Sequence, residues 1–119
     1  TQMLASINPG CDYDAFKFTV TSLTAVQLTT GGTGDTTMQL IDCATNVVMA
    51  CDDDGGAGLL SLINGCLYPG DYCVRIRAYG ATSTFNYQLN STSSAGCPLP
   101  GTATGDGLFR CNGFGTCPP

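Results

Sequence analysis

The run Asp52, Asp53 and Asp54 stands directly before Gly55 and Gly56 and is the most chemically distinctive stretch of the sequence. Adjacent carboxylates repel one another unless they are solvated or bridged by a cation, and oxygen clusters of this kind suit Ca²⁺. Neighbouring side chains of an extended chain point to opposite sides, so all of them reach one ion only if the chain turns, which the two glycines permit. The run predicts a calcium site, with an exposed, solvated loop as the alternative.

Catalysis is not expected, because the sequence has no histidine, which is the commonest general base and the usual partner of a nucleophilic Ser or Cys. All nine acidic residues are Asp, and Trp is absent as well. A pair of carboxylates could act in a glycosidase, but one of them would need a raised pKa in an apolar pocket, and a Gly-rich acidic turn is expected to be wet. We therefore expect a protein that is not an enzyme.

Eight cysteines in 119 residues, without histidine and without a Cys-x-x-Cys pair, predict a disulfide framework in an oxidising compartment. A turn at Pro69-Gly70 would place Cys66 opposite Cys73 on a hairpin, and a hairpin turning near Thr45-Asn46 would allow Cys43 to pair with Cys51. The remaining cysteines have three possible connectivities. The shortest of these joins Cys11 to Cys97 and Cys111 to Cys117, and a bridge to another chain stays open.

Strands are expected nearly everywhere, since apolar and polar residues alternate over residues 14–21, 72–79 and 85–90. Weaker strand patterns cover residues 3–7, 24–29, 38–43, 47–51 and 59–63, separated by Gly, Pro, Asn and Asp clusters. No stretch has a helical apolar stripe bounded by caps. The pattern predicts an all-β, antiparallel, jelly-roll-like β-sandwich of about eight short strands, stapled by disulfides.

The composition of the sequence changes after residue 95, where apolar and polar residues no longer alternate and Gly, Pro and Cys become frequent. We expect a sandwich over residues 1–95 and an extended tail over residues 96–119, tied back to the body or to a neighbour by its three cysteines. Within the tail, the segment from Cys111 to Cys117 faintly resembles a fragment of an epidermal-growth-factor-like module. A simple Gly-rich disulfide loop is the favoured interpretation of that segment.

Several motifs occur in a characteristic order between Ile7 and Leu89: Asp12-x-Asp14-x-Phe16-x-Phe18, a strand over residues 37–42 after Gly34-Asp35, the acidic turn, Leu67-x-Pro69-Gly70-x-Tyr72-x-Val74-x-Ile76, and Phe85-x-Tyr87-x-Leu89. Together they resemble the bacterial pre-peptidase C-terminal domain family. The resemblance implies a compact sandwich appended to secreted proteases or surface proteins, with an accessory, binding or calcium-holding role. It also implies that the loops holding Asp12, Asp14 and Asp35 converge on the acidic turn, which makes these residues the additional calcium ligands.

The chain carries a net charge of −5 with only four basic residues, which argues against nucleic-acid binding. It has no run of about 18 apolar residues, so we expect no membrane span, and it opens without a signal peptide, as a mature or excised piece would. Asn90-Ser91-Thr92 is a complete acceptor sequon for N-glycosylation, placed where the Asn is expected to face water. These features predict an extracellular, secreted or cell-surface glycoprotein.

Two classes of function fit the sequence. The first is a structural module, glycosylated and stabilised by calcium, that self-associates into a surface or matrix fibre or contacts neighbouring domains of a longer secreted chain. The second is an accessory domain of a secreted hydrolase that binds polysaccharide or protein. Tyr13, Tyr68 and Tyr79 are the only candidates for an exposed aromatic row, so the structural class is favoured, with assembly through the tail.

Overall fold

The computed structural model describes residues 2–7, 13–32, 36–52, 60–78, 85–97 and 99–104. These residues form nine strands, and none of them lies in a helix that could cross a membrane. The strands are β1 (Gln2–Ile7), β2 (Tyr13–Val20), β3 (Thr24–Gly32), β4 (Thr36–Asp42), β5 (Val47–Asp52), β6 (Leu62–Leu67), β7 (Gly70–Ala78), β8 (Phe85–Ala95) and β9 (Thr102–Thr104).

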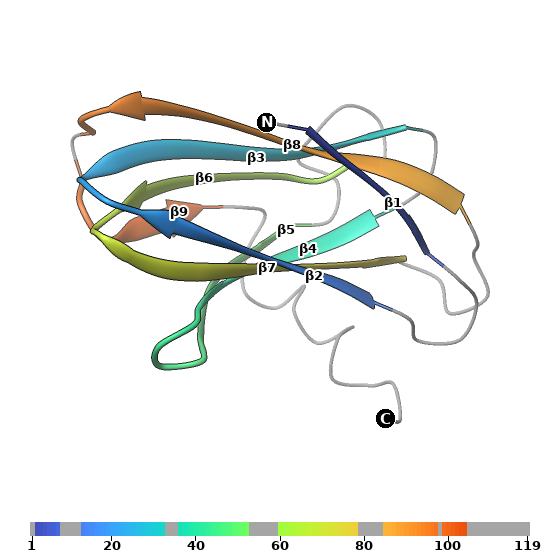
Figure 1. Cartoon of the computed structure of the whole chain (residues 1–119), viewed down its shortest axis with the longest axis horizontal. Coiled ribbons are helices and arrows are strands. Elements are labelled where there is room, and N and C mark those ends of the chain that lie inside the picture. The colour runs from blue at the N-terminus through green and yellow to red at the C-terminus, as the bar shows by residue number, and fades with distance from the viewer. Residues whose placement is uncertain are drawn as a thin grey trace.

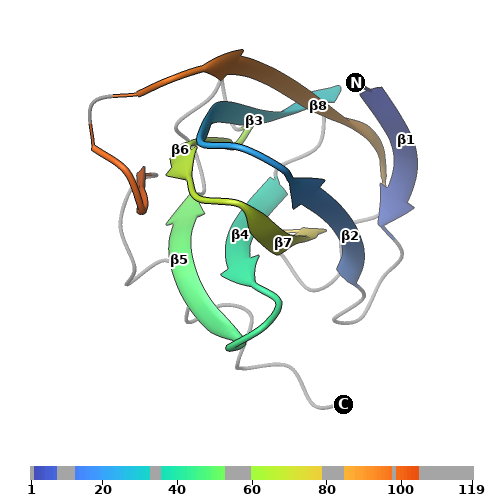
Figure 2. The ribbon, with the colours of Figure 1, turned by 60° about the vertical axis from the view of Figure 1, so that its left-hand side comes forward.

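The strands make two antiparallel sheets that lie face to face (Figures 1 and 2). One sheet has the order β1-β8-β3-β6-β9, and the other has the order β2-β7-β4-β5. From β1 to β8 the chain changes sheet at every connection except the β4–β5 hairpin. This alternation makes a jelly roll and confirms the predicted disulfide-stapled sandwich.

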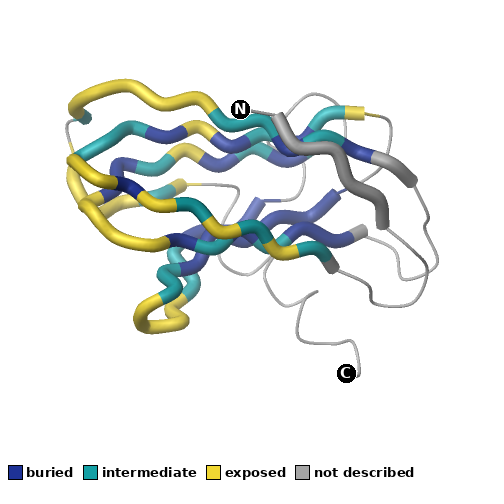
Figure 3. Tube along the Cα trace, viewed as in Figure 1, coloured by how far each residue is buried: buried dark blue, intermediate teal, exposed yellow. Residues whose placement is uncertain are grey.

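The core lies between the sheets, where the apolar members of each alternating strand meet (Figure 3). Met38, Leu40, Ile63, Val74 and Ile76 are at most 1% exposed. Phe16 and Phe18 of β2 pack against this cluster while remaining partly exposed. The period-two pattern of the sequence therefore selects the face of each strand that enters the core.

The β4–β5 hairpin turns through residues 43–46, and its local chemistry explains its shape. Asp42 Oδ1 accepts a hydrogen bond from the Ala44 N–H at 2.9 Å, and the Asn46 N–H donates to the Asp42 carbonyl at 2.7 Å. Asn46 has a φ of 61°, a left-handed conformation that Asn tolerates better than most residues. The turn ends there, and β5 returns beside β4.

A buried hydroxyl network joins β3, β4 and the segment that leads into β6. The Thr36 hydroxyl lies 2.7 Å from the Thr30 hydroxyl and 2.9 Å from the Ser61 hydroxyl. The Ser61 N–H donates to Thr30 Oγ1 at 2.8 Å, and the Thr30 N–H donates to the Ser61 carbonyl at 3.1 Å. These bonds satisfy polar groups that would otherwise be costly to bury.

The strand predicted over residues 59–63 was misplaced, because β6 covers Leu62–Leu67 and contains Asn64-Gly65, a pair that resembles a turn. Gly65 pairs with Val26 of β3, and a Cβ at Gly65 would lie 3.1 Å from the Leu67 side chain. The glycine is therefore explained by close packing and not by a turn.

Two further stretches of sheet were not predicted. β8 continues beyond residue 90 to Ala95, where its polar residues pair with β3. β9 lies in the segment expected to be an extended tail, and it pairs with β6 over Asn64 to Cys66. Backbone pairing, which does not require apolar side chains, accounts for both.

Candidate functional site

Two disulfides join the described cysteines, and both pairings differ from those predicted. Cys43 is bonded to Cys73 with a Cα–Cα distance of 5.6 Å, and Cys66 is bonded to Cys97 with a Cα–Cα distance of 5.8 Å. Cys51 is also disulfide-bonded. The disulfide state of these five cysteines agrees with the prediction, whereas Cys11, Cys111 and Cys117, with the predicted Cys111–Cys117 bond, lie outside the described residues.

The Cys66–Cys73 prediction is wrong because the Pro69-Gly70 connection does not close a hairpin. It carries the chain from β6 in one sheet to β7 in the other, so the two cysteines do not face each other. Cys66 instead bonds Cys97, which follows β8 in the same sheet. This bond also excludes the predicted Cys11–Cys97 pair.

The Cys43–Cys51 prediction is wrong because of register. The β4–β5 hairpin does exist, but Cys51 pairs with Gln39 in the middle of β4, whereas Cys43 lies in the turn. Cys73 is near the turn because it pairs with Ile41 of β4, and the Cys43 N–H donates to the Asp71 carbonyl at 3.1 Å. The neighbouring strand β7 therefore supplies the partner.

Two of the six predicted calcium ligands, Asp14 and Asp52, are described. Asp53 and Asp54 of the acidic run lie outside the described residues, as do Asp12 and Asp35. Within the described ranges, no group of at least three Asp, Glu, His or Cys side chains is placed to hold a metal ion.

Asp52 is not part of a wet turn, as the sequence suggested. It is the last residue of β5 and is only 1% exposed, with Oδ2 accepting the Leu62 N–H at 2.8 Å. Its side chain lies on the core side because Asp52 pairs with Met38. The carboxylate thus ties β5 to the start of β6.

Asp14 joins the two sheets. It lies in β2 and is half-buried, and its Oδ2 accepts a hydrogen bond of 2.8 Å from the Tyr87 hydroxyl of β8. A carboxylate that bonds a largely buried phenol across the sandwich has a structural role already. Any additional role as a metal ligand would use the remaining oxygen lone pairs.

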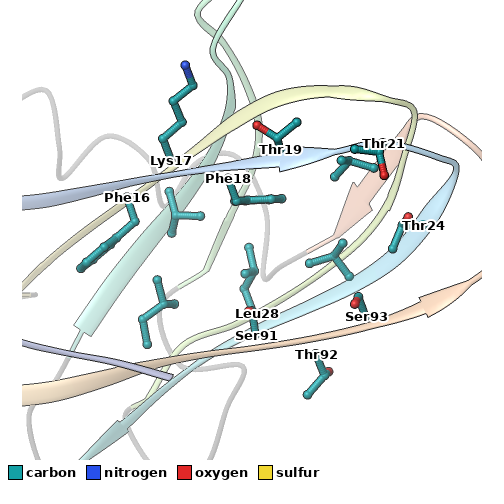
Figure 4. Close-up of a pocket in the computed structure, with 14 residues that line it drawn as sticks. Phe16, Lys17, Phe18, Thr19, Thr21, Thr24, Leu28, Ser91, Thr92 and Ser93 are labelled. Carbon is teal, nitrogen blue, oxygen red and sulfur yellow. The ribbon is translucent and has the colours of Figure 1, made fainter. Parts of the chain in front are cut away.

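The sandwich is open along one side, where a groove of about 270 Å³ lies between β2 and β8 (Figure 4). Its apolar wall is formed by Phe16, Phe18, Val20, Val26, Leu28, Val74 and Leu89. Figure 4 shows the Phe16 ring directed into the sandwich, with Lys17 and Thr19 directed away from it. Hydroxyls line the rim, from Thr21 and Thr24 on one side and Ser91 and Ser93 on the other.

The groove exists because β8 is longer than β1. The β1–β8 ladder runs from Gln2 paired with Asn90 to Ile7 paired with Phe85. β8 continues to Ala95, and residues 92–95 pair with β3; no described strand pairs with them on the β1 side. Among the described strands, β2 is likewise at an edge and pairs only with β7. The groove therefore lies between two strand edges.

One ion pair lies on the outer side of β2, close to the groove. Lys17 Nζ lies 3.6 Å from Asp71 Oδ2, and both side chains are exposed. The Thr19 hydroxyl donates to Asp71 Oδ1 at 2.7 Å, and this hydrogen bond, followed by the charge of Lys17, lowers the pKa of Asp71. Lys17 is the one cation among the described residues that line the groove, and a carboxylate balances its charge.

Asn90, the sequon residue, lies in the middle of β8 rather than at its end. It pairs with Gln2 on one side and Thr29 on the other. Its side chain is half-buried and alternates with the buried Tyr87 and Leu89, so it lies on the outer face of the sheet. Tyr68 is 57% exposed, whereas the side chains of Tyr13 and Tyr79 lie outside the description.

No family model matches the sequence, and no curated protein is significantly similar to it. Among solved structures, the chain is similar to the pre-peptidase C-terminal domain of a collagenase from Bacillus anthracis, with a TM-score of 0.61, 19% identity, and coverage of 77% of this chain and 88% of that one. It is also similar to PliG from Aeromonas hydrophila, a periplasmic inhibitor of g-type lysozyme, with a TM-score of 0.62, 12% identity, and coverage of 79% and 85%. The protein thus has the fold of pre-peptidase C-terminal domains, the family that its motifs resemble.

Proposed function

We propose that the chain is a non-catalytic extracellular module whose copies associate into a surface or matrix fibre through the open side of the sandwich. The observation that carries this proposal is the groove between β2 and β8, which has an apolar floor and adjoins a length of β8 edge outside the β1 ladder. An extended segment added there would gain backbone hydrogen bonds from β8, and its alternate side chains would enter the groove.

The segment that fits this role is the tail of a second copy. Residues 105–119, which follow β9, contain the apolar residues Phe109 and Phe114, and burying these rings against a partner would be favourable. An extended segment of about 15 residues spans roughly 50 Å, which is more than the width of one small domain. Contacts between different surfaces of successive copies do not close on themselves, and they generate fibres.

Adjacent residues of β8 provide a matched test, because Ser93 lies on the groove side and Ser94 on the outer side, and both are exposed. Ser93→Trp fills the groove and is expected to prevent fibre formation, observed by electron microscopy, while Ser94→Trp is expected to leave it unchanged. Deletion of residues 105–119, which leaves β9 in place, should give a folded monomer. Fibres formed by the truncated chain or by Ser93→Trp would contradict the proposal.

Calcium and sugar complete the proposed module. Asp53 and Asp54, with Asp12, Asp14 and Asp35, are the proposed calcium ligands, and Asp52 contributes by fixing the strand that leads to them. Asn90 is the proposed glycan site, on the outer face of the five-stranded sheet. Both features would increase resistance to proteolysis in an extracellular assembly.

A second candidate function is an accessory domain of a secreted hydrolase that binds protein. It is favoured by the similarity of fold to a domain of a collagenase. The same groove would then take an extended segment of another protein. Monomers that bind an unfolded polypeptide and lose this binding in Ser93→Trp would favour this candidate over the fibre.

A further inference from the structure

Charge is distributed unequally between the two sheets. The strands β1, β3, β6, β8 and β9 contain no Asp, Glu, Lys or Arg. Every charged residue in the described part of the chain lies in the other sheet: Asp14, Lys17, Asp42, Asp52, Asp71, Arg75 and Arg77. Among the described residues, a ligand that meets the outer face of the five-stranded sheet therefore meets neutral groups only.

The outer face of this sheet is rich in amides and hydroxyls. Strand alternation places Gln27 and Thr29 of β3, Asn64 of β6, and Gln88, Asn90, Thr92 and Ser94 of β8 on this face. Register brings them into rows, since Gln27 pairs with Thr92 on one side and with Asn64 on the other. The face thus presents both donors and acceptors without a net charge.

A shallow hollow of about 440 Å³ lies in this face, a volume within the ~300–1,000 Å³ typical of ligand sites. Ala25 lies between Gln27 on its own strand and Ser94 on the neighbouring strand, so its short side chain leaves a low apolar floor. Gln27, Asn64, Thr92 and Ser94 surround that floor, and each of the four is exposed.

A hydrogen bond joins two amide side chains at the hollow. Gln27 Nε2 donates to Asn64 Oδ1 at 3.2 Å. This bond uses one N–H of Gln27 and the oxygen of Asn64, while Gln27 also carries an acceptor, Oε1, and Asn64 a donor, Nδ2. A sugar hydroxyl both donates and accepts, so it can bond the two amides together, while the C–H face of the ring rests on Ala25.

We propose that this hollow is a binding site for a neutral polysaccharide. Acidic glycans, nucleic acids and phosphorylated ligands would find no cation among the described residues of this face, whereas a neutral glycan requires none. The hollow and the groove lie on opposite faces of the sheet, because Ser93 and Ser94 direct their side chains to opposite sides, although Val26, Thr92 and Ser93 line both. The success or failure of the polysaccharide site is therefore independent of the proposed fibre assembly.

The test uses the whole chain produced in a host that does not glycosylate Asn90. Binding of cellohexaose, xylohexaose and mannohexaose is measured by chemical-shift perturbation or calorimetry, with polygalacturonate as the charged comparison. At least one neutral hexasaccharide is expected to bind, with an affinity that changes less than about twofold between low salt and about 1 M NaCl. Failure of all three to bind, or preferential binding of polygalacturonate, would overturn the proposal.

Single substitutions test whether the saccharide binds in the hollow. Ser94→Trp and Ala25→Gln fill the hollow and should abolish binding, and Gln27→Leu should weaken it about tenfold because it removes one side of the amide pair. Ser93→Trp is the matched control and should bind as the parent does. If Ser94→Trp binds normally, or Ser93→Trp alone loses binding, the saccharide lies elsewhere and the assignment to the hollow is wrong.

Discussion

Removal of the Cys43–Cys73 disulfide tests the covalent framework directly. The bond closes a loop with a sequence separation of 30. Chain-entropy arguments give a contribution of roughly 3.5 kcal/mol for a loop of this length. Because small domains unfold with about 5–15 kcal/mol, the double variant Cys43→Ala/Cys73→Ala should remain folded but lose a large part of its stability.

The expected change is large enough to measure by thermal or urea unfolding. A loss of this size should lower the Tm on the order of 10–20 °C for a domain of about this length. The control Cys66→Ala/Cys97→Ala removes a loop of nearly equal separation, 31, and should cost a similar amount. A cost well below 1 kcal/mol for both would contradict the entropy argument.

The number of free thiols distinguishes the Cys43–Cys73 pairing from the alternative pairings. If Cys43 and Cys73 are partners, their joint removal leaves no free thiol in the denatured, unreduced protein. If Cys43 paired with Cys51 and Cys66 with Cys73, the same double variant would expose two thiols. Two labelled thiols per chain would therefore refute the pairing described above.

Three further outcomes are expected. Thr36→Val leaves the partners of a buried hydroxyl unsatisfied and should destabilise the fold by about 1–3 kcal/mol in urea unfolding; an unchanged midpoint would exclude a role for the network. Because the pKa of Asp71 is lowered in the folded state, its contribution to stability is present above its ordinary pKa of 3.8 and is lost as the pH falls through the lowered value. Thr19→Val removes the main cause, so carboxyl-carbon NMR should show the pKa of Asp71 rising; no rise would refute that cause. Calcium should raise the Tm and EDTA should lower it, with a weaker calcium effect in Asp53→Asn or Asp54→Asn; an unchanged Tm in EDTA would remove the calcium site.

The fold could be predicted where the alternation of apolar and polar residues within one strand shows which of its side chains are buried. Phe16 and Phe18 in β2 and Tyr72 and Val74 in β7 alternate with polar residues, and these strands appear where the pattern places them. The strand predicted over residues 59–63 stops short of Gly65, because the reason for this glycine, close contact with Leu67, depends on packing and not on local conformation. Polar stretches such as residues 91–95 carry no apolar signal, although they pair along their whole length.

The disulfides and the candidate sites depend on relations between distant strands. A Pro-Gly turn after Cys66 is compatible with a hairpin and with a crossing between sheets, and only the second occurs. The groove depends on where β1 ends relative to β8, and the hollow depends on which strands adjoin Gln27. Neither the relative lengths of β1 and β8 nor the neighbours of Gln27 can be predicted from the sequence pattern of a single strand.

The antiparallel pairing of β1 with β8 also has a consequence for how the chain reaches its native state. Gln2 pairs with Asn90 and Ile7 pairs with Phe85, so the first strand has no partner in its own sheet until most of the chain is present. β2 likewise waits for β7, since Tyr13 pairs with Arg77. Non-local pairing of this kind gives a high contact order and slow folding, on the scale of milliseconds to seconds for all-β domains. Nascent chains that end before about residue 85 should therefore remain unfolded in this region and accessible to proteases or chaperones, and the fold should form late and in one cooperative step.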